Sequence, residues 1–275
     1  MNSPSDRCAT FRRLHASGCF VLPNPWDIGS AKALAHLGFK ALATTSSGFA
    51  WSIGRNDNAI TLEQALSHMR DIAGAVDIPV NADFEGGFAI EPEGVAANVT
   101  AAVATGVAGL SIEDSTGDPA SPLFEFELAV ERIRAARRAL DAAGSGIVLT
   151  GRSEGFIVGR PDMAETLRRL TAYAEAGAEC LYAPGLRNAA DMAAVVQAVA
   201  PHPVNILVSG NYSTVAEVAA LGARRISVGG ALARAAWAGF LKSANEIAAL
   251  GTFTGLDGAA KSSEIELLLE RSVTR

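Results

Sequence analysis

The chain has 275 residues, 49% of them hydrophobic and 19% charged, a composition typical of a globular protein long enough to build one large core. Its net charge is -6 and its Lys and Arg residues do not cluster, which argues against binding to nucleic acid or to an anionic membrane. The three cysteines lack zinc or disulfide spacing, and neither a signal segment nor a membrane-spanning apolar stretch is visible, so we expect a cytoplasmic protein with reduced thiols.

Eight short apolar runs alternate with longer Ala-rich segments in which apolar residues recur every three or four positions. Several of these longer segments end on Gly, as in ATGVAGL and EAGAECL, which is typical of helix C-termini. Eight near-continuous apolar strands separated by helices favour parallel pairing, so the pattern predicts an α/β fold, a (β/α)8 TIM-type barrel. A doubly wound open sheet is the alternative, which the lack of GxGxxG after the first run disfavours. The runs lie at residues 20–24, 41–46, 79–84, 109–114, 147–152, 180–184, 204–209 and 225–230.

Charged side chains stand at the ends of three consecutive predicted strands. NADFEGGF carries Asp83 and Glu85, GLSIED carries Glu113 and Asp114, and IVLTGR ends on Arg152. All strands of such a barrel end at one face, so these side chains are expected at a common mouth. Carboxylates in one cavity repel each other unless a cation neutralises them, and oxygen ligands without His or Cys suit Mg²⁺, with Mn²⁺ as the alternative. We expect Asp83 to bind the metal directly, with the other acids holding its water ligands.

The segments ADFEGGF, SIED and GRSEGF, in this order and at predicted strand ends, resemble motifs of the isocitrate lyase/phosphoenolpyruvate mutase superfamily. The resemblance covers most of the chain, from the first strand to about residue 245. It implies that Asp83 is the direct Mg²⁺ ligand and that Glu85 and Glu113 contact metal-bound waters. It also implies that Arg152 is the cation that pairs with the substrate, and that Glu154 positions Arg152 or the metal waters.

Two segments after the second strand gain roles from the same resemblance. TSSGF is similar to the superfamily's cradle for a substrate carboxylate, in which the Ser47 side chain and the amides of Gly48 and Phe49 would bind. A turn with consecutive N–H groups forms such an anion nest. WSIGRNDN falls at the gating loop, where Asp57 matches the catalytic loop acid of the mutase branch, and a closing loop would protect an enolate from water. An ordinary solvated loop charge is the alternative for Asp57.

Two polar residues lie within later strands, Tyr182 in the sixth and Asn205 in the seventh. The side-chain period of a strand allows either to point inward, and we expect Asn205 to bind substrate. The four histidines are expected in packing or surface roles, and Cys180 as a small core residue.

The chain also departs from the superfamily's pattern. Lyases that act on isocitrate and methylisocitrate carry K-[KR]-C-G-H after the fourth strand, where the Cys transfers a proton, whereas this chain reads STGDPASPLFEF. The mutase branch has a Lys in this region and a His after the sixth strand, where this chain has Ser115 and Pro184. The residues of this chain therefore support the mechanism that the superfamily members share, but not the proton-transferring residue of the isocitrate lyases or of the mutase branch.

We therefore expect a Mg²⁺-dependent carbon–carbon lyase that cleaves or forms a bond in a small 2-oxo or 2-hydroxy di- or tricarboxylate through an enolate. Oxaloacetate and 2-oxoglutarate are suitable ligands, since each has a chelating 2-oxo acid head and a second carboxylate. Two alternatives are a phosphonopyruvate-type mutase or hydrolase that acts on a P–C bond, and a non-catalytic barrel that binds a keto acid.

Residues 1–250 are expected to form the barrel, and residues 251–275 a C-terminal helical extension after the Gly-rich segment GTFTGLDG. The superfamily resemblance implies a homo-oligomer, a dimer or a tetramer, in which this last helix is exchanged between subunits. A helix packed on its own barrel is the alternative.

Overall fold

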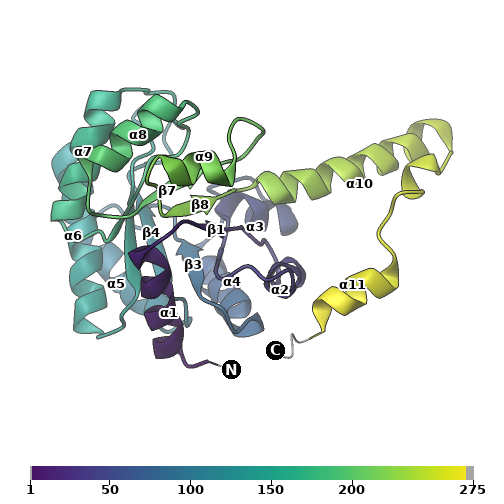
Figure 1. Ribbon diagram of the computed structural model, residues 1–275, viewed down its shortest axis with the longest axis horizontal. Helices are drawn as coiled ribbons and strands as arrows, with labels where there is room; N and C mark the ends of the chain where they lie inside the picture. The colour runs from purple at the N-terminus through teal and green to yellow at the C-terminus, as the bar shows by residue number, and fades with distance from the viewer. Residues whose placement is uncertain (1, 271–275) are drawn as a thin grey trace.

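The computed structural model describes residues 2–270, which form a barrel of eight parallel strands surrounded by helices (Figure 1). The α/β barrel predicted from the alternating pattern is confirmed. The strands are β1 (Phe20–Leu22), β2 (Leu42–Ala43), β3 (Val80–Asp83), β4 (Gly109–Glu113), β5 (Val148–Arg152), β6 (Cys180–Tyr182), β7 (Val204–Leu207) and β8 (Arg225–Ser227).

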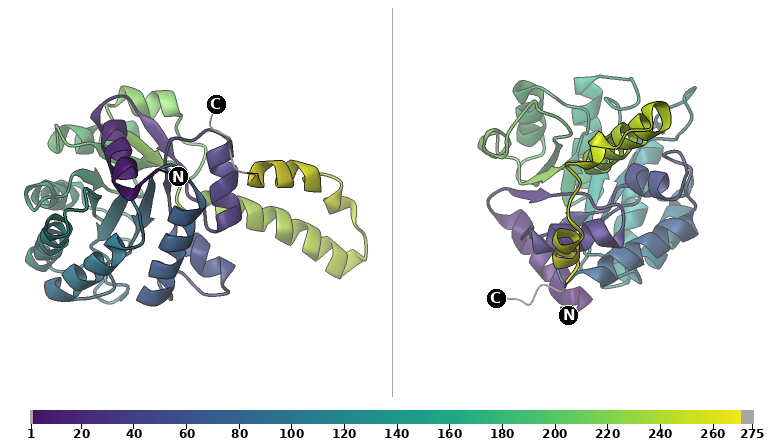
Figure 2. Two further views of the ribbon diagram at one scale, coloured as in Figure 1. Left: turned by 90° about the horizontal axis from the view of Figure 1, so that it is seen from below. Right: turned by 90° about the vertical axis from the view of Figure 1, so that its right-hand side faces the viewer.

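Helices follow the strands and cover the outside of the barrel (Figure 2). Polar N-caps begin several of them: the side chains of Asp27, Thr45 and Asp162 each accept a backbone N–H of the first helical turn, which would otherwise be unpaired. None of the described helices combines the length and the apolarity that crossing a bilayer requires. The helices are α1 (Pro4–Ala16), α2 (Ile28–His36), α3 (Ser46–Ser52), α4 (Leu62–Ala75), α5 (Pro92–Val103), α6 (Phe126–Ala142), α7 (Met163–Glu175), α8 (Ala189–Ala198), α9 (Val215–Ala220), α10 (Ala231–Leu250) and α11 (Ser262–Leu269), with a short 3₁₀ turn η1 (Thr254–Leu256).

The strands are hydrogen-bonded in the order β1-β8-β7-β6-β5-β4-β3-β2. The barrel is nearly closed, because β1 and β2 meet only beyond the end of β1. There the Ala43 N–H donates to the carbonyl of Pro23 at 3.1 Å, and the Asn24 amide donates to the carbonyl of Thr44 at 2.9 Å. The C-terminal ends of the first two strands, from which site loops begin, are thus held together.

The barrel interior contains a layer of buried polar side chains. Arg225 of β8 donates to Asn205 of β7 at 2.9 Å and to Thr150 of β5 at 3.2 Å, and its guanidinium also contacts His15 of α1 at 3.3 Å. Polar side chains at inward positions fill space less completely than the branched aliphatic residues that usually pack such barrels. This layer forms the floor of a cavity at the C-terminal mouth.

The C-terminal segment leaves the barrel as an arm. The long helix α10 projects away from β8 and ends at Gly251, whose left-handed φ of 65° suits a helix terminus, and α11 returns to lie against α2 (Figures 1 and 2). The separation from the barrel therefore begins at residue 231. Residues 271–275 of the predicted extension lie outside the described residues, and the exchange of this arm between subunits stays a prediction.

Candidate active site

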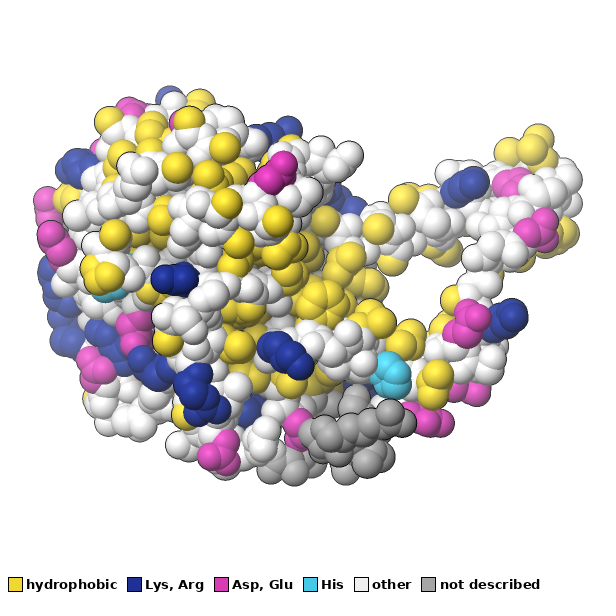
Figure 3. Space-filling model, in the orientation of Figure 1, with side chains coloured by type: hydrophobic (Ala, Val, Ile, Leu, Met, Phe, Trp, Pro, Cys, Tyr) yellow, Lys and Arg dark blue, Asp and Glu magenta, His cyan; other side chains and the backbone are white. Residues whose placement is uncertain are grey.

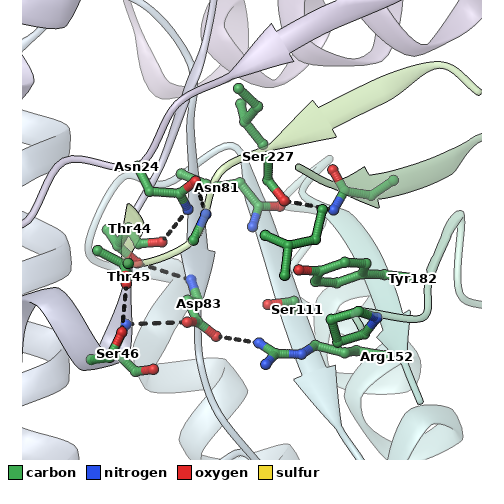
Figure 4. Close-up of a pocket in the computed structure, with 18 of the residues that line it drawn as sticks. Asn24, Thr44, Thr45, Ser46, Asn81, Asp83, Ser111, Arg152, Tyr182 and Ser227 are labelled. Carbon is green, nitrogen blue, oxygen red and sulfur yellow. Dashed lines mark hydrogen bonds and ion pairs between the residues drawn. The ribbon is translucent and has the colours of Figure 1, made fainter. Parts of the chain in front are cut away.

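A cavity of about 160 Å³ opens at the C-terminal ends of the strands. Its wall combines hydroxyl, amide and charged side chains from opposite sides of the barrel, so that Asn24 and Thr44 face Tyr182 and Arg152 across the opening (Figure 4). A polar, concave site at this face is where barrel enzymes bind their substrates.

Arg152 at the end of β5 is the centre of the site. Its Nη1 lies 3.1 Å from Asp83 Oδ1 and 3.2 Å from Glu113 Oε2, and its Nε donates to Glu154 Oε1. The predicted meeting of three strand ends is therefore present in the structure. One guanidinium thus pairs with three carboxyl groups, and burial raises the pKa of Glu113 well above its usual range.

Asp83 connects β3 to the neighbouring strand end. Its Oδ2 accepts the backbone N–H of Ser46 at 3.1 Å, and its own N–H donates to Thr44 Oγ1 at 2.9 Å. With Arg152 on its other oxygen, the Asp83 carboxylate is held in one orientation at the cavity wall (Figure 4).

Glu85 sits in a strained turn just after β3. Its φ is 46°, an uncommon value for a residue with a side chain, and its carbonyl oxygen accepts the Glu113 N–H at 3.0 Å. The buried Arg132 of α6 fixes the turn from behind by donating to the carbonyl oxygens of Gly86, Ala89 and Ile90. These contacts hold the Glu85 side chain beside the other acids.

The acidic groups have the features of a site for a hard cation. Glu85 Oε1 is buried without a hydrogen-bond partner, and burial, Asp83 and Asp57 together raise the pKa of Glu85 to about 8. No three acidic, His or Cys groups among residues 2–270 form a ready-made cage. Mg²⁺ does not need one, since it binds through one or two carboxylates and keeps several waters. Asp83, Glu85 and Glu113 are the residues that would hold it.

Asp114 has a different role from the one expected of it. Glu113 points into the barrel, whereas Asp114 is buried on the other side, where it accepts the backbone N–H of Glu154 at 2.7 Å, the hydroxyl of Tyr173 at 2.6 Å and Arg169 at 3.1 Å. Consecutive strand residues point to opposite faces, which is the signal in the sequence that separates the two acids. Asp114 therefore fixes the segment that carries Arg152 and Glu154 instead of lining the mouth.

The segment predicted as a carboxylate cradle is the first turn of helix α3. The Gly48 N–H donates to Thr45 Oγ1 at 3.4 Å, and the Phe49 N–H donates to the Thr45 carbonyl at 3.1 Å. The Ser47 side chain lines the cavity, while the Phe49 ring stacks on His68 at 3.9 Å. Ser47 is thus placed to contact a ligand, and the roles of Gly48 and Phe49 stay predictions.

The remaining predicted residues, Asp57 and Asn205, both line the cavity. Asp57 lies on the exposed loop after α3, yet burial of its carboxyl and the nearby Asp83 raise its pKa. Asn205 is buried, and its side-chain amide is already shared between Arg225 and Ser227. Tyr182, left open beside Asn205 in the sequence, lines the same cavity, and its ring centre lies 5.3 Å from the guanidinium carbon of Arg152.

The chain is similar in sequence and fold to several known proteins. Residues 11–248 match the family model of phosphoenolpyruvate phosphomutase. The chain is 34% identical to 2-methylisocitrate lyase of Escherichia coli over 53% of this chain and 50% of that protein. It is 29% identical to oxaloacetate decarboxylase of Pseudomonas aeruginosa over 74% and 71% of the two chains. A solved lyase/mutase-type protein from Burkholderia cenocepacia superposes with a TM-score of 0.93, at 44% identity over 96% of each chain.

Proposed function

Because the chain belongs to the isocitrate lyase/phosphoenolpyruvate mutase superfamily, we propose that it is a Mg²⁺-dependent lyase that cleaves a carbon–carbon bond of a small 2-oxo or 2-hydroxy di- or tricarboxylate. The observation that carries the proposal is Arg152, held between Asp83, Glu113 and Glu154 at the mouth of a polar cavity. Relatives whose names state such activities, 2-methylisocitrate lyase and oxaloacetate decarboxylase, support this reaction type.

In the proposed mechanism, Arg152 donates to the carboxylate and the 2-oxo oxygen of the substrate, and the Ser47 hydroxyl contacts the acid head from the opposite wall. A divalent cation at Asp83 would supply further positive charge against the enolate oxygen. Fixed donors aimed at the atom where negative charge develops lower the barrier most, because they need no reorganisation during the reaction. Asp83 and Glu154 keep the guanidinium in place while the bond at C3 breaks.

The test is calorimetric titration with oxaloacetate, 2-oxoglutarate and phosphonopyruvate, with and without Mg²⁺, followed by NMR of the same mixtures. Mg²⁺-dependent binding of one of the first two acids, with a C–C cleavage product, is the expected result. Binding of a 2-oxo acid without any product would instead favour a non-catalytic keto-acid-binding barrel.

A second candidate, a phosphonopyruvate-type mutase or hydrolase, is favoured by one observation. Asp57 faces the cavity next to Asp83 and interacts with Ser46, which is where the loop acid of the mutase branch is expected. This candidate would be established if the protein turns over phosphonopyruvate in the same assays and Asp57→Ala loses that activity. Phosphonopyruvate turnover that survives in Asp57→Ala would remove its basis.

Stabilisation by Mg²⁺ is expected to grow with pH because of Glu85. Its folded pKa of about 8 lies above the ordinary 4.5, so folding stabilises the protonated form of the Glu85 side chain. Without metal, this contribution to the stability of the protein is fully present below pH 4.5 and is lost as the pH rises towards 8. Mg²⁺ needs the ionised carboxylate, so its stabilising effect increases over the same range. Differential scanning fluorimetry across this range, with and without Mg²⁺, measures both trends.

Glu85→Gln should flatten both trends, whereas the exposed Glu93→Gln on α5 should leave them unchanged. A Mg²⁺ shift in Tm that is equal at both ends of the range in the unmodified protein would contradict the assignment of Glu85 to the metal site.

We also propose that the protein is a homo-oligomer, because the arm exposes large apolar side chains. Trp237 is 40% exposed and Phe240 59% exposed, and Ala233 is the buried residue of α10. Apolar side chains lie uncovered on the arm in Figure 3, and clustered exposure of this kind marks protein contacts.

Light scattering should therefore give at least twice the 28.4 kDa of one chain. Phe240→Asp is expected to shift the population toward the monomer. Asn245→Asp, which adds the same charge to an exposed position of α10, should not. A monomeric unmodified protein at micromolar concentration would refute the proposal.

A further inference from the structure

Three tyrosines occur in the chain, and one of them differs from the other two in its surroundings. The hydroxyl of Tyr173 donates to Asp114 at 2.6 Å, and that of Tyr212 donates to the carbonyl of Leu207 at 2.6 Å. The phenol of Tyr182 projects into the cavity above Arg152, where its polar neighbour is Ser227 (Figure 4). Its proton is therefore available to a bound molecule.

The proposed reaction needs such a proton. Breaking a C–C bond into a 2-oxo acid leaves an electron pair on carbon, and the enolate must receive a proton before the product is released. No Cys, Lys or His lines the cavity among the described residues, and the segment after β4, residues 115–124, contributes no side chain to it. The acid must therefore come from another part of the wall.

Several other hydroxyl and carboxyl groups of the wall are already engaged, and the Ser47 hydroxyl is assigned above to the acid head of the substrate. Ser111 donates to the carbonyl of Ala82 at 3.2 Å, and Asp83 is paired with Arg152. Asp57 lies on the exposed loop after α3, where its Oδ1 accepts the backbone N–H of Asn58 at 3.1 Å. Ser227 accepts the amide of Asn205 at 2.8 Å, and its hydroxyl proton is turned toward the phenol oxygen of Tyr182.

We propose that Tyr182 is the catalytic acid of this site, which protonates the carbon released when the C–C bond breaks. The electron pair of the broken bond becomes the enolate, its carbon takes the proton of the Tyr182 hydroxyl, and the resulting phenolate regains a proton from water. This assignment rests on the proposed function, because it requires an enolate.

The position of the ring supports this role. Tyr182 is the last residue of β6 and is paired in register with Arg152 of β5 and Asn205 of β7. The Tyr182 ring centre lies 5.3 Å from the guanidinium carbon of Arg152, so a 2-oxo acid held by Arg152 would have its third carbon within reach of the same wall. Burial raises the pKa of Tyr182 to about 12, so the hydroxyl is protonated at neutral pH and acts as a donor.

The test compares Tyr182→Phe with the unmodified protein, since this change removes one oxygen and keeps the ring. We expect kcat to fall by about 10² to 10⁴-fold on whichever of the three titrated compounds is a substrate. KM and the affinity for oxalate, a planar analogue of the pyruvate enolate, should change less than about twofold, since the oxygens that bind the head group are unchanged. The exchange of pyruvate methyl hydrogens for deuterium in D₂O, followed by NMR, should be lost together with kcat. Tyr212→Phe, with its hydroxyl outside the cavity, is the matched control and should retain all three values.

The outcomes separate this inference from the proposed function. If Tyr182→Phe cleaves substrate and exchanges hydrogen as the unmodified protein does, Tyr182 is not the acid and the proposed function stands. If oxalate affinity falls as much as kcat, Tyr182 binds the ligand and does not transfer the proton, and the inference is overturned. If the unmodified protein cleaves no acid of the panel, the proposed function fails and this inference fails with it. An unchanged Tm for Tyr182→Phe is required before any of these readings.

Discussion

Replacing Arg152 by Gln is expected to reduce kcat/KM by roughly 10³-fold, because a single preorganised donor aimed at developing charge already accounts for 10² to 10³. Arg152 does more than donate. Its Nη1 lies 3.1 Å from Asp83 and 3.2 Å from Glu113, so removing it also frees the carboxylates that it orients. Arg152→Lys keeps the charge without the planar fork, and its activity should fall between the two. Steady-state kinetics with the active acid of the panel measures each loss.

The same substitution should also destabilise the protein. Removing one partner of a buried ion pair costs about 3 to 5 kcal/mol, since it leaves uncompensated charge in a poorly solvated place. Asp83, Glu113 and Glu154 would then repel each other, and this repulsion is relieved at low pH where carboxyls hold protons more readily. The Tm deficit of Arg152→Gln should therefore be larger in mildly basic than in mildly acidic buffer. The exposed Arg160→Gln serves as the control for both activity and Tm. Activity within about threefold of the unmodified protein would show that Arg152 contributes no transition-state contact.

The convergence of charged strand ends could be predicted from the sequence because it follows from local pattern and from the barrel topology that this pattern indicates. A run of apolar residues that ends in Asp83, Glu113 or Arg152 places the charge at the end of a strand, and the barrel topology brings the three ends to one face. The contacts of Arg152 with both acids follow from this arrangement. Resemblance to a superfamily added the roles but was not needed for the placement.

Other parts of the site depend on contacts that no local pattern contains. Arg132 fixes the Glu85 turn from a helix more than forty residues further along the chain. Helix α3 begins where a turn was expected, because Thr45 caps a segment that is too short for its helical period to be visible. The direction of Asp114 was predictable in principle from the two-residue period of a strand. The direction of the Tyr182 side chain was not predictable, since the sequence does not show which residues of β6 point into the barrel.

The residue at which the arm leaves the barrel could not be read from the sequence either, which placed the start of the extension at residue 251 rather than 231. The segment 231–250 has the apolar repeats of a helix that covers a barrel strand, yet α10 projects outward and leaves Trp237 and Phe240 exposed. An amphipathic pattern predicts that a helix buries one face, but it does not indicate whether the same chain or a second molecule covers that face. This is why the oligomeric state has to be measured.

Asp83→Asn is expected to abolish both metal binding and turnover, a loss of about 10³-fold or more, since a carbonyl oxygen without charge is a poor ligand for Mg²⁺. The amide also cannot satisfy its neighbours. The Ser46 N–H and Arg152 are both donors, so the NH₂ group of Asn would face one of them. Binding can be measured apart from activity by titrating Mn²⁺ and following its EPR signal, with the exposed Asp71→Asn of α4 as the control.

A second consequence of Asp83→Asn concerns Glu85, and it tests the cluster without any substrate. Burial keeps the pKa of Glu85 high, and the negative charges of Asp83 and Asp57 raise it further to about 8. Neutralising Asp83 removes one of these charges, so Glu85 should ionise at lower pH and the fall of apo-protein Tm with pH should begin earlier. If Mn²⁺ still binds with unchanged affinity and the pH dependence of Tm does not move, Asp83 is not part of the metal site. If only the Tm profile moves, Asp83 interacts with Glu85 but the cation is held by Glu85 and Glu113. We expect the loss of both Mn²⁺ affinity and the original Tm profile, because Asp83 is proposed to bind the metal and its charge raises the pKa of Glu85.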